Sequence, residues 1–199
     1  MGAMTPLVKV AGYRDLWLRK AFAYTIGGAV TSASIGATFG LVGQFVIPDA
    51  ESRVSWIGLA ILSLIAVGRD TGLMRLPING LRRQTDGGWR HAFGPTVGSF
   101  LWGLDLGLVF STRLAYSGPW LVAAAACVSH SPLTGSAIFL AYWTGRASSV
   151  WVEPLMSTSV REAPAVLSWI NERLSYVRLV NVAGIGMLVI IAGLATGGV

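Results

Sequence analysis

One long apolar segment of this chain contains two charged residues. Their types and spacing make them the strongest candidates in the sequence for a functional site. Asp105 and Arg113 lie eight positions apart in a stretch, from about Phe93 to Val128, that carries no other charge. On a helix this spacing places both side chains on roughly the same face, two turns apart. A charged side chain inside a membrane is costly, so it usually faces a cavity or a partner.

The stretch STRLAYSGP around Arg113 predicts a break in this segment, between about Ser111 and Pro119. The segment is too long for one straight crossing, so we expect a kinked or re-entrant helix. In one interpretation the break directs Arg113, with Ser111 and Thr112 beside it, at an anionic ligand, as broken transporter helices do. In the other, the stretch is an external loop and Arg113 reaches the outer surface.

Asp105 is the only acidic residue in any predicted span. A buried carboxylate in a low dielectric is neutralised by protonation or by a cation. Asp105 could therefore couple to a proton or cation, or it could form a structural hydrogen bond to a neighbouring helix. Trp102 and Gly103, which precede Asp105 in the same segment, are compatible with either role.

Cys127 and His130 are three residues apart, on one helical face. A thiolate beside an imidazole suits Cu(I), Zn or Hg(II), but two ligands are too few for a closed site. A core cysteine near a histidine at a membrane end is the simpler interpretation, so we predict no metal and no cofactor. The chain has no phosphate loop, metalloprotease helix or nucleophile elbow, and we therefore predict no enzyme.

The composition is that of a membrane protein. The chain is 53% hydrophobic and only 12% charged, against about 25% charged in soluble domains. Its net charge of +6 would favour nucleic acid in a soluble protein, but here the basic residues lie between apolar runs. They indicate membrane topology instead, and we predict the lipid bilayer, and no nucleic acid, as partner.

We predict an all-α, polytopic bundle of about five spans, with a broken third span. Residues 1–20 alternate apolar and basic side chains and predict an interfacial amphipathic segment, and residues 21–199 form a single transmembrane domain. The predicted spans are Ala23–Ile47, Trp56–Gly68, the broken Phe93–Val128, Pro132–Val152 and a last span over 176–197.

The basic residues predict the orientation of the chain in a cell (inner) membrane. Of 15 Lys and Arg residues, all except Arg53 and Arg113 fall on one side of these spans. By the positive-inside rule, the N-terminus is cytoplasmic and the C-terminus external. Arg82, Arg83 and Arg90 in the second loop are either ordinary topogenic charges or a site for anionic lipid head groups.

Small residues predict where helices approach closely. Gly36, Gly40 and Gly43 form a stripe on the first span, and Gly103 and Gly107 follow Trp102 on the third. Such stripes allow backbones to meet in lipid. We predict that the first stripe mediates association with a second copy of the chain or with another membrane subunit.

Two stretches resemble the DsbD/CcdA family of thiol-electron transporters, over about residues 22 to 198. YTIGGAVTSASIGATFGLVG is similar to their second membrane helix, and GLVFSTRLAYSGPWLVAAAACVSHSPLTGSAIFLAYWTGRA to their second cysteine-bearing helix and the span after it. The resemblance implies a helix broken at mid-membrane, with Ser111, Thr112 and Arg113 at the turn. Tyr142 and Gly145 match the pattern that ends the following helix.

The departures from this family determine the expected function. Arg113 stands where the family has a thiol, and we expect the chain to lack the first cysteine-bearing helix of the family. Thiol exchange needs two sulfurs, so Cys127 alone cannot relay electrons. We expect a scaffold without thiol relay, most simply one that lets a small ion or solute permeate at the broken segment. The alternative is a non-catalytic accessory or assembly subunit of a membrane redox complex.

Overall fold

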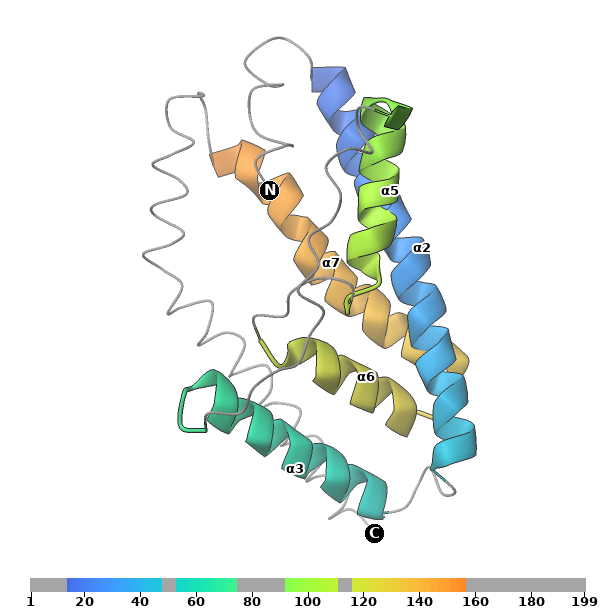
Figure 1. Cartoon of the computed structure of the whole chain (residues 1–199), viewed down its shortest axis with the longest axis vertical. Coiled ribbons are helices and arrows are strands. Elements are labelled where there is room, and N and C mark those ends of the chain that lie inside the picture. The colour runs from blue at the N-terminus through green and yellow to red at the C-terminus, as the bar shows by residue number, and fades with distance from the viewer. Residues whose placement is uncertain (1–13, 48–52, 75–91, 111–115, 157–199) are drawn as a thin grey trace.

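The computed structural model describes residues 14–47, 53–74, 92–110 and 116–156, and helices joined by short turns make up these ranges (Figure 1). No strand occurs in the described ranges, which confirms the all-α class there. The predicted last span over 176–197 and the loop with Arg82, Arg83 and Arg90 lie outside them. The helices within these ranges are α2 (Arg14–Val46), α3 (Arg53–Asp70), α5 (Pro95–Gly107), α6 (Gly118–Val128) and α7 (Pro132–Met156).

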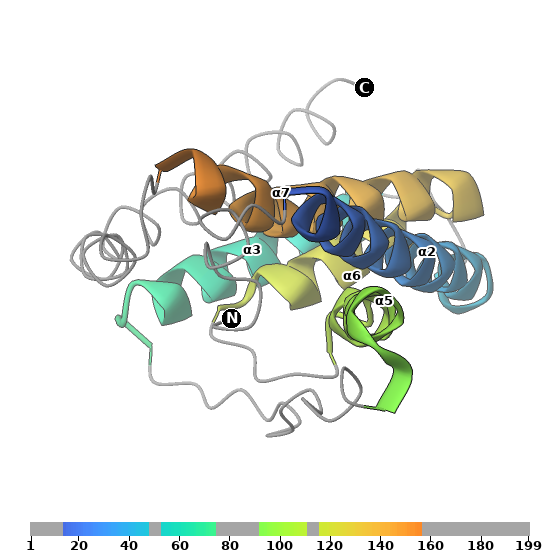
Figure 2. The same cartoon turned by 90° about the horizontal axis from the view of Figure 1, so that it is seen from above.

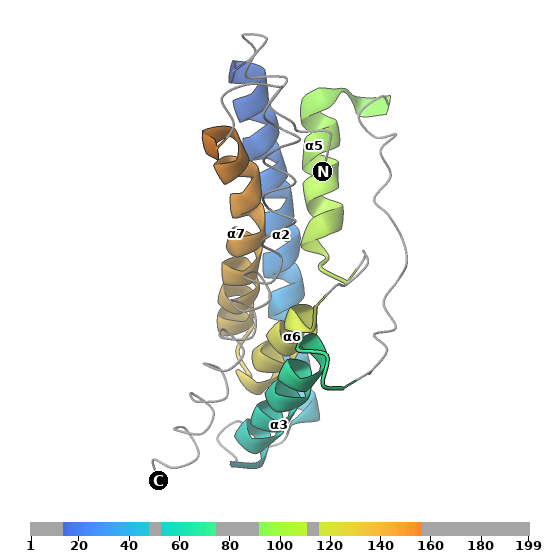
Figure 3. The same ribbon diagram turned by 90° about the vertical axis from the view of Figure 1, so that its left-hand side faces the viewer.

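Helix α2 is the centre of the arrangement. Figure 3 shows it between α7 and α5, and both neighbours pack along it. Helices α6 and α3 lie across one end of this three-helix unit, with α6 against α2 and α7, and α3 packed on α6 (Figures 1 and 2). The broken third segment is therefore present as two separate helices, α5 and α6, that run in different directions.

Several predicted boundaries differ from the structure. Helix α2 begins at Arg14 and continues without interruption into the first predicted span, and α7 extends to Met156, beyond the predicted Val152. Residues 1–13 lie outside the described ranges. Helix α3 extends over Arg53–Asp70, beyond the predicted Trp56–Gly68 at both ends.

The surface of α2 is the reverse of that of a helix in a soluble protein. Its buried face consists almost entirely of small residues: Gly27, Gly28, Ser32, Gly36, Gly40 and Gly43. Its exposed face carries large apolar side chains, among them Phe22, Ile26, Val30 and Phe45, the last with 86% of its area exposed. A soluble helix buries its large apolar residues and exposes polar ones. Small residues inside and large apolar residues outside are typical of a helix packed in lipid.

The hydroxyl groups on α2 fit the same environment. Thr31, Ser34 and Thr38 each donate a hydrogen bond to the carbonyl oxygen four residues earlier, over 3.2, 2.9 and 2.9 Å. These groups are therefore satisfied without water, as a helix in hydrocarbon requires. Among the described helices, α2 is the one long and apolar enough to cross a membrane by itself, over Asp15–Val46.

The glycine stripe of α2 is used within the chain. A Cβ at Gly36 would overlap the backbone of Gly135 in α7, and one at Gly43 would overlap the carbonyl oxygen of Cys127 in α6. Gly40 lies equally close to the backbone of Ser131. We therefore do not retain the prediction that this stripe binds another subunit, because its surface is already covered by α6 and α7.

Hydrogen bonds between helices add to these close backbone contacts. The hydroxyl of Ser32 donates to the carbonyl oxygen of Gly107 in α5 over 3.0 Å, and that of Ser136 in α7 donates to Ala33 over 2.8 Å. Gly103 and Gly107 of α5 lie against the backbone of Tyr24 and Gly28. Helices α2, α5 and α7 thus form one tightly packed unit.

Candidate functional site

The junction between α5 and α6 is the place where the predicted site residues can be compared with the structure. Helix α5 ends at Gly107 and α6 begins at Gly118, with Pro119 in its first turn, as expected for proline at a helix start. Ser111, Thr112 and Arg113 lie outside the described residues, and the structure does not place them.

Asp105 lies inside the bundle, on the last turn of α5. Only 5% of its area is exposed, although α5 is short and its end is close by. Trp102, one turn earlier, packs against Tyr24, with ring centroids 6.1 Å apart, and Tyr24 in turn packs against Trp143 at 5.2 Å. The carboxyl group of Asp105 thus belongs to the interior of the protein.

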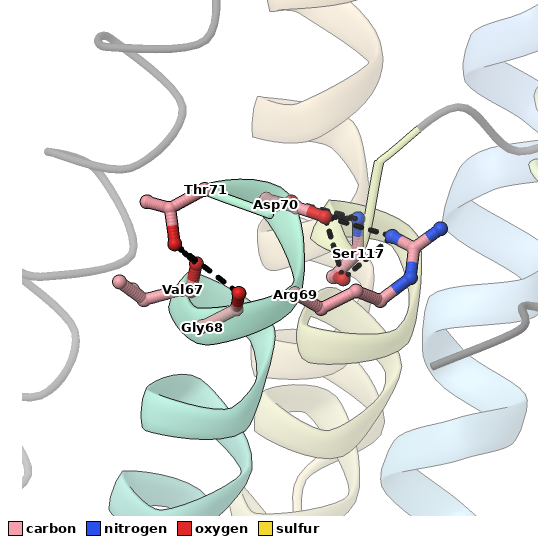
Figure 4. A network of polar contacts seen from close by, with 6 residues as sticks. All are labelled: Val67, Gly68, Arg69, Asp70, Thr71 and Ser117. Atoms are coloured by element: carbon pink, nitrogen blue, oxygen red, sulfur yellow. Dashed lines mark hydrogen bonds and ion pairs between the residues drawn. The ribbon is translucent and has the colours of Figure 1, made fainter. Parts of the chain in front are cut away.

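A second buried carboxylate, which the sequence interpretation missed, lies at the start of α6. The side chain of Asp70, the last residue of α3, is 1% exposed and forms an ion pair with Arg69 (Nη1 to Oδ1, 2.7 Å). It also accepts hydrogen bonds from the backbone N–H of Ser117, over 3.0 Å to Oδ2, and from the Ser117 hydroxyl, over 2.9 Å to Oδ1. Arg69 completes the group by donating to the Ser117 hydroxyl over 3.0 Å (Figure 4). We call Arg69, Asp70 and Ser117 the Asp70 cluster.

The electrostatics of the Asp70 cluster follow from the direction of α6. The N-terminus of a helix carries partial positive charge and free N–H groups, which favour an anion. Asp70 supplies that anion from α3, and the Ser117 N–H donates to its carboxylate. The N–H of Ser117 is thus already used inside the chain.

The position of Asp70 explains why it was missed. In the sequence, Arg69 and Asp70 follow an apolar run and precede Thr71 and Gly72, which is typical of the start of a solvated loop. The partner of Asp70 is 47 residues away in the chain. One signal was available, since a charged pair directly after an apolar helix marks a possible buried ion pair as well as a loop.

Cys127 and His130 lie at the other end of α6. The Cys127 thiol is free, and the carbonyl oxygen of His130 accepts a hydrogen bond from the side chain of Gln44 over 2.7 Å. The His130 Nε2 atom is buried without a hydrogen-bond partner. Within the described ranges no group of three metal-ligating side chains occurs. The structure thus offers these two residues no third ligand from that part of the chain.

Comparison with known proteins gives one distant relationship. The chain is similar to the methylamine utilization protein MauF of Methylophilus methylotrophus, with 24% identity over 147 residues. The matched region covers 73% of this chain and 52% of MauF, so the chain spans about half the length of that relative. No family model matches the chain, and no solved structure matches it. None of these findings concerns the DsbD/CcdA transporters, and that resemblance stays a prediction.

Proposed function

We propose that this chain is a multi-pass protein of the cell (inner) membrane that lets a small ion or solute permeate where α5 ends and α6 begins. The proposal includes the cytoplasmic N-terminus and external C-terminus that the basic residues predict. It keeps the DsbD/CcdA-like scaffold without thiol relay as its structural basis. Association with a second copy or another subunit remains part of it, through a surface other than the glycine stripe.

Support for several membrane-embedded helices comes from α3 as well as α2. Large apolar side chains are exposed on more than one side of α3, for example at Ile57, Leu62 and Leu64. No charged residue occurs in α3 between Arg53 and Arg69. A helix of 18 residues is about 27 Å long, slightly shorter than the hydrocarbon core, so α3 supports an embedded helix although α2 is the one that meets the length and composition of a full span.

The burial of Asp105 beside the end of α5 is the observation that carries the permeation proposal. An ionisable residue within a membrane protein is expensive to bury and usually marks a pathway or a proton relay. Asp70 adds a second buried carboxylate, at the start of α6. Since Asp70 is paired with Arg69, the preference for a cation or a proton over an anion rests on Asp105. MauF is a methylamine utilization protein, and the protonated form of methylamine is a small cation, so methylammonium is a reasonable first probe.

Flux through proteoliposomes tests this function. We expect the intact chain to admit at least one of methylammonium chloride, potassium chloride or glycerol faster than empty vesicles, as measured by stopped-flow light scattering. Asp105→Asn should lower that flux about tenfold or more, because a contact to a charged group is worth about 1.5–3 kcal/mol and 1.4 kcal/mol is a factor of ten. Val97→Ala, on the exposed side of the same helix, is the matched control and should leave the flux unchanged.

Two results would contradict permeation. If Asp105→Asn folds in normal yield and conducts as well as the unsubstituted chain, Asp105 does not belong to a pathway. If the intact chain conducts none of the probes, the alternative of a non-catalytic accessory subunit becomes the better explanation. That alternative predicts instead that the chain co-purifies with a defined membrane complex.

A further inference from the structure

The two ends of helix α6 are held differently. Its C-terminal end meets α2 backbone to backbone, because a Cβ at Gly43 would overlap the carbonyl oxygen of Cys127, just as α2, α5 and α7 meet one another at their glycines. Nearer its N-terminus α6 packs through side chains, with Ala123 and Ala126 buried among apolar side chains of α2, α7 and the residues after α5. Its contacts with α3 there include Leu121 against Ala66 and the Asp70 cluster.

The junction before α6 holds a strained backbone. Val109 has φ of 60° and is fully buried. A β-branched residue in this left-handed region is a genuine outlier, because its Cβ crowds the backbone. Such conformations persist only where the surroundings enforce them, and they concentrate at sites that switch or bind. Here the surroundings include Ala123 and Ala126 of α6 and Phe139 of α7, so the position of α6 helps to keep Val109 strained.

From these two observations we propose that the N-terminal end of α6 is movable, held in the observed position by the Asp70 cluster and driven away from it by the strain at Val109. When the contacts of Asp70 with Ser117 are lost, this end of α6 separates from α3 and Val109 relaxes, while the C-terminal end stays against Gly43. The unit of α2, α5 and α7 stays unchanged, since its glycine contacts do not involve the Asp70 cluster. The proposal concerns motion of α6 and holds whether or not a solute passes at the junction.

Distances between spin labels test this motion in the full chain. Cys127→Ser provides a cysteine-free background, and cysteines replacing Leu62 and Trp120, both exposed, report on the distance between α3 and α6. A second pair, replacing Val30 and Val97, reports on the distance between α2 and α5 as a reference. Each pair is measured with Asp70 intact, with Asp70→Asn and with Thr71→Ala. Thr71 is the matched control, because its hydroxyl bonds carbonyl oxygens of its own helix.

We expect Asp70→Asn to shift or broaden the α3–α6 distance distribution by about 5 Å, the size of a one-turn displacement. The α2–α5 distribution should not change, and Thr71→Ala should change neither. An unchanged α3–α6 distribution overturns the proposal. A change in both pairs also overturns it, since the cluster would then support the whole bundle. If Asp70→Asn does not fold, Ser117→Ala, which keeps the backbone N–H, replaces it under the same criteria.

The role of Val109 is tested by two further substitutions in the Asp70→Asn background. Val109→Gly and Val109→Ala both remove the branched side chain, but only glycine adopts a positive φ without strain. We expect the displacement of α6 to persist with alanine and to shrink with glycine. Equal displacement in the two variants would show that strain at Val109 does not drive the motion.

Discussion

Gly36→Ala should destabilise the protein by about 3 kcal/mol, whereas Gly58→Ala should leave its stability unchanged or slightly higher. At Gly36 the added methyl group would overlap the backbone of Gly135 and Ser136, and a backbone cannot rotate away as a side chain can. Helices α2 and α7 would have to separate along their length. At Gly58, on α3, no atom lies within 4 Å of the added group, and alanine favours the helix.

The two variants differ in position but not in chemistry, so each controls for the other. The measurement is the thermal midpoint of unfolding in mild detergent, followed by tryptophan fluorescence. Equal midpoints for the two variants would contradict the close approach of α2 and α7. If the packing is as described, Gly36→Ala unfolds at a clearly lower temperature and gives less folded protein.

Trp143 and Gly28 should show strong thermodynamic coupling. A Cβ at Gly28 would lie within the indole ring of Trp143, which is 1% exposed and donates from Nε1 to the carbonyl oxygen of Thr25 over 2.9 Å. Trp143→Ala alone should cost about 3–5 kcal/mol through lost packing. Gly28→Ala alone should also be severe, because the ring is fixed by its hydrogen bond and cannot turn aside.

The double variant distinguishes a direct contact between Gly28 and Trp143 from two independent losses of stability. Once Trp143→Ala has removed the ring, Gly28→Ala no longer meets it, so the second substitution should cost at least about 1 kcal/mol less than it does alone. The comparison uses the same detergent unfolding assay. Purely additive losses would mean that Gly28 and Trp143 do not meet in the folded protein.

The positions of the helices were largely predictable from the sequence, for physical reasons. Long apolar runs without charge fix where helices form, and the prolines at 95, 119 and 132 coincide with the first turns of α5, α6 and α7. The break between α5 and α6 followed from the same signals, since Gly118 and Pro119 disfavour continuation of the preceding helix. The buried position of Asp105 was weighed as a possibility from its place in the apolar segment.

The partners of these helices were not predictable in the same way. The spacing of Gly36, Gly40 and Gly43 indicates that another backbone approaches, but it does not say whose backbone. The burial of Asp70 depends on Ser117, far along the chain, and no local pattern encodes that contact. The left-handed backbone of Val109 contradicts the preference of valine, so only the surrounding packing explains it.

The account depends most on the claim that α2 crosses a bilayer with its small residues inside and its large residues in lipid. Nitroxide labels along its exposed face, replacing Ile26, Val30, Ser34, Thr38 and Val42 in turn in the Cys127→Ser background, test this claim directly in reconstituted vesicles. Collisions with oxygen, which concentrates in lipid, should exceed those with a water-soluble nickel chelate at each position and peak near the middle of the series. Collisions dominated by the nickel chelate along the whole face would place α2 in water and contradict the account.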